Sequence, residues 1–187
     1  RTSRARGGRI WQWQYDADGF VSNSISPLGH SVSVQRDAFG LPTEVVDELS
    51  RTNRIAYDVM LRLATVTDPL GNTTGFGYDA AGRLAAVTNP LGAEATLIRD
   101  ADGRVQAQSD FDGFSETFGY TPMGRLAAIT NAILQATRFA YDSAGRLARR
   151  DLPDGTRETW TYDALDNVAA YSDRATNSWT YGYDALG

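Results

Sequence analysis

A tyrosine–aspartate pair that returns every 21 residues, without insertion or deletion, constrains this sequence more than any other feature. The series starts at Tyr15-Asp16 and runs to Tyr183-Asp184, and seven of the nine tyrosines fall on its tyrosine position. A fixed period of this length is typical of repeat architectures, in which each unit is one small element packed on its neighbours. The sequence therefore predicts an array of short tandem repeats.

The residues after the tyrosine are almost as regular as the tyrosine itself. Aspartate follows it, glycine comes three positions later, and arginine with an apolar residue comes next. The motif residues that we single out are Tyr15, Asp16, Gly19, Tyr57, Asp58, Tyr78, Asp79, Gly82, Arg83, Tyr120, Gly124, Arg125, Tyr141, Asp142, Gly145, Arg146, Tyr162 and Asp163. The departures are Arg36 and Arg99 for tyrosine, Thr121 for aspartate, Leu61 for glycine, and Asp166-Asn167 for glycine-arginine.

Each repeat is predicted to be two short strands with a turn at both ends. A large apolar residue stands two positions before the tyrosine, as in Phe76 and Tyr78, so both side chains leave the same face of a strand. In segment 79–82 the aspartate can accept backbone N–H bonds, and the glycine adopts the left-handed conformation at no steric cost. A return strand follows at 83–88, and a second turn, such as segment 68–71, lies about halfway through the unit.

These features predict an all-β fold of tandem 21-residue antiparallel β-hairpin repeats. Eight repeats give roughly sixteen strands, and open twisted sheets rarely exceed about ten without curling, so we expect a spiral wall or hollow shell. In the return strand, Leu63 and Val66 lie three apart, which requires either a bulge or burial on both faces.

The period also divides the chain into predicted segments. Residues 1–14 are expected to be the end of a preceding repeat or a linker, and residues 15–182 eight tandem repeats. Residues 183–187 are expected to be the start of a truncated ninth repeat.

Composition excludes several classes of function. The chain has no cysteine, which removes disulfides, thiolate catalysis and cysteine–zinc sites. The net charge of −5 argues against nucleic acid as the main partner. No apolar run approaches the roughly 20 residues that a membrane-spanning helix needs.

Several residue groups suggest chemistry, but each has a simpler structural interpretation. The Asp-x-Asp-Gly segments at 16–19, 100–103 and 110–113 could suggest calcium, yet they lack the later ligands of a full calcium loop. His30 has no second histidine, and no nucleophile motif accompanies it. We therefore expect no catalytic residue, no cofactor and no metal, and we expect the recurring arginines to pair with the turn aspartates.

The chain resembles a known family in segments 138–147 (RFAYDSAGRL) and 76–84 (FGYDAAGRL), which are close to the core motif of Rhs/YD repeats. That family includes bacterial Rhs polymorphic toxins, the B and C components of insecticidal toxin complexes, wall-associated proteins and animal teneurins. The resemblance implies a large hollow β-shell. In bacterial members the shell commonly encloses a variable C-terminal toxin until delivery, often through type VI secretion.

The resemblance implies that the chain is a wall segment of a shell that encapsulates a toxin. Its partners would be the rest of its own shell and the enclosed toxin domain. Secretion-system spike or adaptor proteins would be further partners, and the protein would be secreted or extracellular after delivery from a bacterium. The alternative is an extracellular adhesion or carbohydrate-binding module, which needs aromatics such as Trp11 and Trp179 on an outer face. Segment 68–71 also resembles the self-cleavage sequence of Rhs proteins, but segment 89–92 occupies the equivalent place one repeat later, so we interpret it as an ordinary repeat turn.

Overall fold

The computed structural model describes residues 2–6 and 9–184, and every regular element in them is a β-strand. The chain divides into two compact units, Arg1–Glu94 and Ala95–Gly187, which are described separately. The strands of the first unit are β1 (Thr2–Arg6), β2 (Arg9–Tyr15), β3 (Val21–Ile25), β4 (Ser31–Arg36), β5 (Pro42–Val46), β6 (Thr52–Tyr57), β7 (Leu63–Thr67), β8 (Thr73–Tyr78) and β9 (Leu84–Thr88). Those of the second are β10 (Glu94–Arg99, which starts at the boundary), β11 (Val105–Ser109), β12 (Ser115–Tyr120), β13 (Leu126–Asn131), β14 (Ala136–Tyr141), β15 (Leu147–Asp151), β16 (Arg157–Tyr162), β17 (Val168–Ser172) and β18 (Ser178–Thr180).

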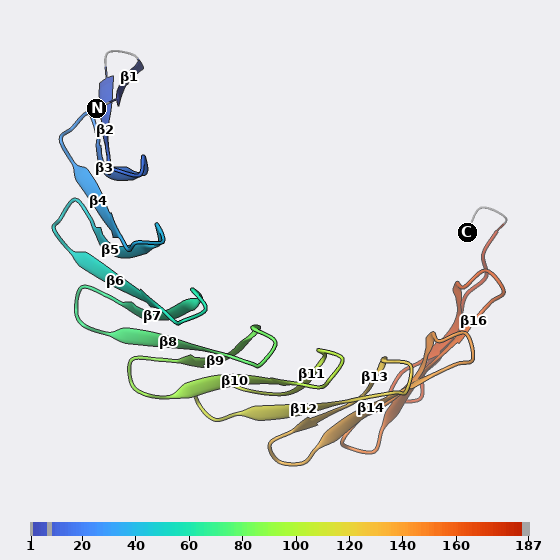
Figure 1. Ribbon diagram of the computed structural model, residues 1–187. Coiled ribbons are helices and arrows are strands. Elements are labelled where there is room, and N and C mark those ends of the chain that lie inside the picture. Colours follow the sequence, from blue (N-terminus) through green and yellow to red (C-terminus); the bar gives the residue numbers. More distant parts are fainter. Residues whose placement is uncertain (1, 7–8, 185–187) are drawn as a thin grey trace. The chain divides into compact units, whose positions relative to one another are not determined.

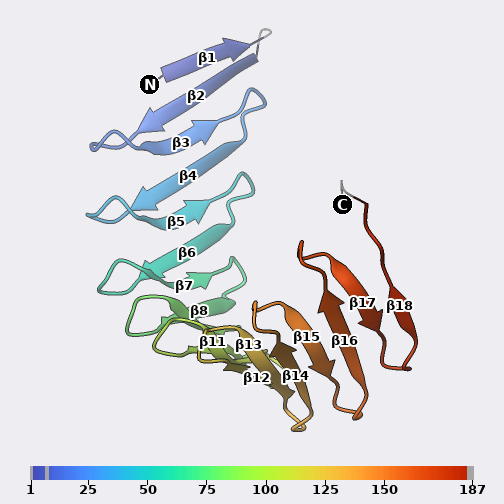
Figure 2. The ribbon, with the colours of Figure 1, turned by 90° about the vertical axis from the view of Figure 1, so that its right-hand side faces the viewer.

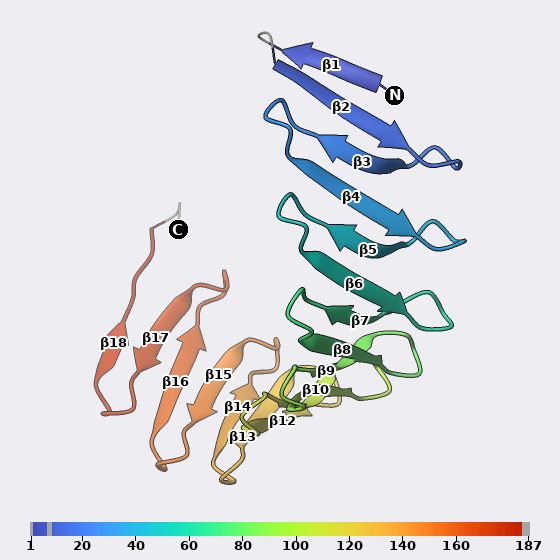
Figure 3. The same ribbon diagram turned by 90° about the vertical axis from the view of Figure 1, so that its left-hand side faces the viewer.

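Within each unit, every strand pairs with the next one along the chain in antiparallel orientation. In the first unit, from β1 to β8, this meander forms the rungs of a ladder (Figures 1 and 2). Figure 3 shows the same strands from the other side, with successive connections on alternating edges. The predicted all-β class with antiparallel hairpin repeats is confirmed.

Both connections of a repeat have one turn geometry. After β8, the N–H of Gly82 donates to the carbonyl of Asp79 at 2.9 Å, and the N–H of Asp79 donates to the carbonyl of Arg83 at 2.9 Å. The other turn of the repeat repeats this pattern from Asp68, with Gly71 in the place of Gly82. Both glycines have a positive φ, 79° and 88°, which explains why glycine is the commonest residue at the fourth position of these turns.

A β-bulge explains why apolar residues in the return strand lie three apart. Tyr57 pairs with Leu63, but Ala56 pairs with Thr65, so the register shifts by one residue at this point. The shift places Leu63 and Val66 on the same face as Tyr57, despite their odd spacing. The same shift occurs at Tyr78, Tyr120, Tyr141 and Tyr162. Of the two explanations that the sequence leaves open, the bulge accounts for the spacing.

The two faces of each sheet differ in side-chain size. We call the face that carries the motif tyrosines the tyrosine face; in the first unit it includes directly opposed pairs such as Ile55–Val66 and Phe76–Val87. The other face carries small or polar residues, such as Gly77 opposite Ala86 and Glu44 opposite Arg54. No apolar side chain among the described residues is buried, because a single sheet layer has no second layer to cover it.

The described residues near the start of the chain are in strands. Within residues 1–14 they form β1 and most of β2, which pair with each other. Residues 185–187 of the expected ninth repeat lie outside the described residues. Among the residues that are described, no helix is long and apolar enough to cross a membrane.

Candidate functional site: the joint between repeats

The turn aspartate organises the hairpin that follows each motif tyrosine. One carboxylate oxygen of Asp58, Oδ1, accepts the N–H groups of Met60 at 2.8 Å and Arg62 at 3.0 Å. The other, Oδ2, accepts Nε of Arg62 at 2.8 Å and forms an ion pair with Nη2 at 2.7 Å. The backbone N–H and then the guanidinium of Arg62 lower the pKa of Asp58, because both stabilise its charged form.

The same aspartate–arginine pair closes other repeats. The pairs within 2.8 Å are Asp79–Arg83, Asp100–Arg104 and Asp142–Arg146, and Asp47–Arg51 forms the same pair on the other kind of turn. Where Thr121 replaces aspartate, its hydroxyl still accepts the N–H of Arg125 at 3.1 Å. The arginines therefore neutralise turn carboxylates, the role expected from their position.

From Tyr57 onward, each motif tyrosine reaches back into the preceding repeat through its hydroxyl group. Tyr78 Oη donates to the carbonyl of Leu63 at 2.8 Å, the residue after Arg62. The equivalent bonds span 15 residues each: Tyr57 to Pro42, Tyr120 to Val105, Tyr141 to Leu126, Tyr162 to Leu147 and Tyr183 to Val168. The tyrosine therefore acts as a tie between repeats as well as a packing residue.

The arginine of one repeat covers the tyrosine ring of the next. The guanidinium carbon of Arg62 lies 4.4 Å from the ring centroid of Tyr78, a cation–π distance. The same contact joins Arg104 to Tyr120, Arg125 to Tyr141 and Arg146 to Tyr162, at 5.0, 5.8 and 4.5 Å. One repeat thus holds the tyrosine of the next repeat through two adjacent residues: the arginine contacts the tyrosine ring, and the carbonyl of the following leucine or valine accepts a hydrogen bond from the hydroxyl. We call this pair of contacts the joint.

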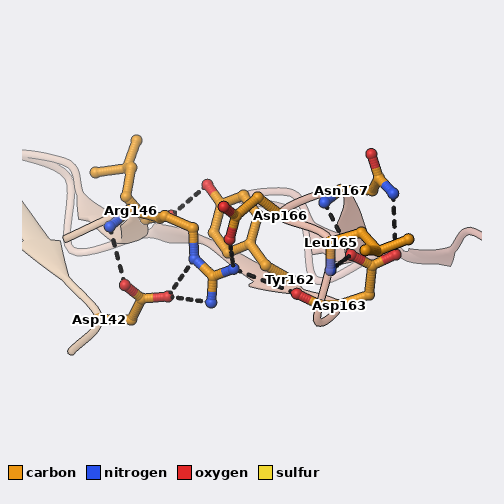
Figure 4. Close-up of polar contacts among 8 residues, drawn as sticks. Asp142, Arg146, Tyr162, Asp163, Leu165, Asp166 and Asn167 are labelled. Atoms are coloured by element: carbon orange, nitrogen blue, oxygen red, sulfur yellow. Dashed lines mark hydrogen bonds and ion pairs between the residues drawn. The ribbon is translucent and has the colours of Figure 1, made fainter. Parts of the chain in front are cut away.

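The turn glycine has a second role, which is to leave room for this arginine. A Cβ at Gly145 would lie 2.0 Å from a guanidinium nitrogen of Arg125. Where Asp166 replaces the glycine, at φ 68°, its carboxylate instead pairs with Arg146 of the preceding repeat (Figure 4). The same guanidinium donates to the carbonyl of Asp163 at 3.3 Å. This departure from the motif therefore preserves the joint.

Arg36 stands at a tyrosine position and still forms the joint, because the arginine and the aromatic residue have exchanged places here. Its guanidinium donates to the carbonyl of Val21 at 2.9 Å, over the same 15-residue span as the tyrosine bonds. Phe20 occupies the usual arginine position, and Arg36 lies 5.3 Å from its ring centroid. Phe20 also takes the place of the arginine against the next turn glycine, since a Cβ at Gly40 would lie 3.2 Å from its ring.

Sequence patterns singled out the residues of this joint but could not show which repeats they connect. The aspartate and arginine lie on one turn, whereas the tyrosine on which the arginine packs belongs to the next repeat. The hydroxyl bond and the Phe20–Arg36 exchange were missed. The signal available for the exchange was that an aromatic residue and an arginine depart from the motif at linked positions, 20 and 36.

The other candidate groups lie in ordinary turns. Asp102 pairs with Arg104, and among the described residues no group of three or more acidic or histidine side chains could hold a metal ion. His30 is half exposed, with its Nδ1 3.2 Å from Glu48. In segment 68–71, Asp68 accepts the N–H groups of Leu70 and Asn72, which is the same turn that Asn89 makes one repeat later.

A shallow pocket of about 550 Å³ lies on the tyrosine face of the second unit. Trp160, Tyr171 and Trp179 form a ladder of rings on neighbouring strands, with centroids 5.5 and 5.6 Å apart. Beside them Glu158, which is 8% exposed, forms an ion pair with Arg150 directly opposite on β15. The rings of this ladder partly cover one another, while Tyr181 and Tyr183, which also line the pocket, are 47% and 44% exposed.

Comparison with protein families identifies the repeat. The RHS Repeat model matches residues 57–94 and 141–177. A comparison with curated proteins finds no match. Solved structures with a similar fold include the TcdB2–TccC3 complex (20% identity, TM-score 0.49, covering 87% of this chain and 9% of that one) and the same complex with Cdc42 (19%, 0.49, 87% and 9%). A third is the Photorhabdus luminescens Tc holotoxin pore (15%, 0.40, 96% and 13%).

The fold and the joint define a tandem antiparallel β-hairpin repeat protein. Within the chain, residues 57–94 and 141–177 match the RHS Repeat model, in agreement with the resemblance that the sequence predicted. The chain spans 9 to 13% of the length of these solved chains.

Proposed function

We propose that this chain is a wall segment of an Rhs shell, whose role is to enclose and protect a toxin until delivery. The observation that carries the proposal is the repeated joint. Tyrosine hydroxyls, turn carboxylates and guanidinium groups, the polar groups that recur in the motif, are occupied in holding one repeat to the next. A chain whose recurring polar groups bind neighbouring repeats is suited to forming a continuous wall.

The proposal extends to what this segment does not do and to what surrounds it. The segment has no catalytic residue of its own, and its partners are the remainder of its shell and an enclosed C-terminal toxin domain. The whole protein acts outside the bacterium that makes it. Type VI secretion is the proposed route, with spike or adaptor proteins as contacts during delivery.

The test is limited proteolysis of the intact protein that contains this segment, followed by mass spectrometry of the fragments. Enclosure predicts that a non-repeat C-terminal domain resists the protease as long as the repeats do, and that both are digested after unfolding. Tyr141→Ala, which removes one joint, should expose the enclosed domain earlier, whereas Val59→Ala, at a side chain 98% exposed, should not. Immediate loss of the C-terminal domain from intact repeats would exclude a sheltering role.

A second candidate, an adhesion or carbohydrate-binding module, is favoured by the exposure of Trp11 (44%) and Trp179 (45%). Against it, Trp179 stacks on Tyr171 at an interplanar angle of 16°, which covers one face of the ring. Binding of the full chain to a glycan array, lost in Trp11→Ala and Trp179→Ala, would support adhesion. Absence of any glycan binding would leave the wall segment as the function.

A further inference from the structure

One edge of the first unit carries a row of exposed leucines. They lie at the third position of the turns after β3, β5, β7 and β9. The first three of these turns lie along one side of the ladder in Figure 2. We call Leu28, Leu49, Leu70 and Leu91 the leucine row; their exposed fractions are 83%, 65%, 86% and 94%.

The turn itself does not require leucine. Only the backbone N–H of Leu70 takes part in its turn, where it donates to Asp68 Oδ1 at 2.8 Å. In the second unit, Asp112 occupies the same turn position and its N–H makes the same bond, to Asp110 at 3.0 Å. Exposed turn positions usually hold glycine, proline, asparagine, aspartate or serine. Four consecutive leucines at such a position therefore point to a contact outside the turn.

The spacing of the row restricts what can cover it. Successive leucines are separated by two strands, so at about 4.8 Å per strand they recur roughly every 10 Å and the row is about 30 Å long. Another strip of the same repeats has the same spacing and stays in register along the whole row. Stable interfaces bury about 800 Å² from each partner, which a row can approach and one isolated leucine cannot.

The opposite edge of the first unit has matching chemistry. The turn between β4 and β5 exposes Phe39 (71%), and the turn between β6 and β7 exposes Val59 (98%) and Met60 (70%). The two central residues of each of these turns carry no charge, and in the leucine-row turns only the central residue Glu48 does. The aspartates that open the turns, such as Asp58 and Asp68, have their carboxylates bonded to backbone N–H groups of the turn. Contact between the two edges would therefore bury apolar groups on both sides with little loss of charge solvation.

We propose that the leucine row packs against the Phe39–Met60 edge of a second copy of this chain, so that two strips of repeats meet edge to edge. The contact is heterologous, because one edge of each strip meets the other edge of its neighbour. The inference does not depend on an enclosed cargo. It concerns how strips of repeats join side by side.

Sedimentation of the full chain over a range of concentrations tests this contact. Wild type should self-associate, and Leu→Ser at all four positions of the leucine row should weaken association by about 100-fold or more. Phe39→Ser with Met60→Ser should also weaken it. The control is Ile98→Ser, at an exposed position (56%) on a strand rather than on a turn, and it should leave association unchanged. Far-UV circular dichroism checks that strand content is preserved.

Cross-linking separates this arrangement from other modes of association, because the chain has no cysteine of its own. A mixture of Leu70→Cys and Met60→Cys proteins should form disulfide-linked pairs faster than either protein alone. Three results would overturn the proposal: a wild type that stays monomeric, a leucine-row variant that associates like wild type, and Leu70→Cys protein that links fastest to itself.

Discussion

The two units share one backbone and differ in what they place on it. In the first unit the tyrosine face carries aliphatic and phenylalanine pairs, such as Ile55–Val66. In the second, the position equivalent to Val66 in one repeat holds Arg150, which pairs with Phe139 and forms an ion pair with Glu158 on the next strand. In the repeat after it, the equivalent pair is Trp160–Tyr171. Both units keep the same turns and the same bulge. The difference teaches that the turns and the joint define the repeat, while the positions between them can vary.

The turn edges differ in the same way. Turns of the first unit that follow the short strands carry the leucine row at their third position, whereas the equivalent positions in the second unit hold Asp112, Ile133, Asp154 and Ala175. The backbone bonds of these turns are alike. Edge chemistry can therefore be specialised along the strip without a change of fold.

The largest expected effect is on the stability of the second unit. Truncating one residue of its aromatic ladder should destabilise it more than the equivalent truncation destabilises the first unit. Trp160→Ala should cost about 3 kcal/mol, because it removes a large side chain and its contact with Tyr171. Phe76→Ala, at the equivalent position of the first unit, should cost about 2 kcal/mol, since its opposed partner is Val87. Denaturant unfolding with hydrogen exchange resolved by strand measures both. Equal losses would show that the ladder adds nothing beyond burial.

The exchanged joint of the first unit offers a second test. Phe20→Arg alone should destabilise by about 1 to 2 kcal/mol, because it places a second cation beside Arg36 and removes the ring contact. Adding Arg36→Tyr should restore stability to within about 0.5 kcal/mol of wild type, since it recreates the common joint. A double-mutant cycle by denaturant unfolding measures the coupling. Additive effects would mean that the two residues do not act as a pair.

A matched pair of glycines in the second unit separates backbone conformation from room for arginine. Gly145 and Gly155 both have φ 84°, but a Cβ would meet Arg125 at the first and nothing within 4 Å at the second. Gly155→Ala should cost about 1 kcal/mol and Gly145→Ala about 1.5 kcal/mol, because the guanidinium must leave the ring of Tyr141. Thermal unfolding compares them. In an Arg125→Ala background the difference should vanish, and its persistence would contradict the contact.

The smallest effect concerns acid stability. The side-chain amide of Asn72 is the largest cause that lowers the pKa of Asp68 below its ordinary 3.8. A carboxylate with a lowered folded pKa contributes stability above its unfolded pKa, and that contribution is lost as pH falls through the folded pKa. Because Asp47, Asp58 and several other turn aspartates are shifted in the same direction, the chain should lose stability below about pH 4.

Asp68→Asn provides the control for that titration, because Asn89 already forms the same turn one repeat later. The variant should be slightly less acid-sensitive than wild type, as measured by urea midpoints at pH 6 and pH 3. Identical pH dependence would show that this carboxylate contributes nothing through its charge.

Local sequence determined the fold class, the turns and the strand boundaries of this protein. Asp79 and Gly82 specify their turn through bonds within a few residues, and alternation around Phe76 and Tyr78 specifies the strand, so neither depends on distant contacts. Because the motif recurs with a fixed period, each 21-residue repeat forms the same β-hairpin.

Only the tertiary structure decided how repeats are joined. The bulge opposite Tyr57, the hydroxyl bond from Tyr78 to the Leu63 carbonyl and the exchange between Phe20 and Arg36 all depend on the register of neighbouring strands. Register is a property of the pairing and not of either strand alone, since a shift of one residue would turn each side chain to the opposite face.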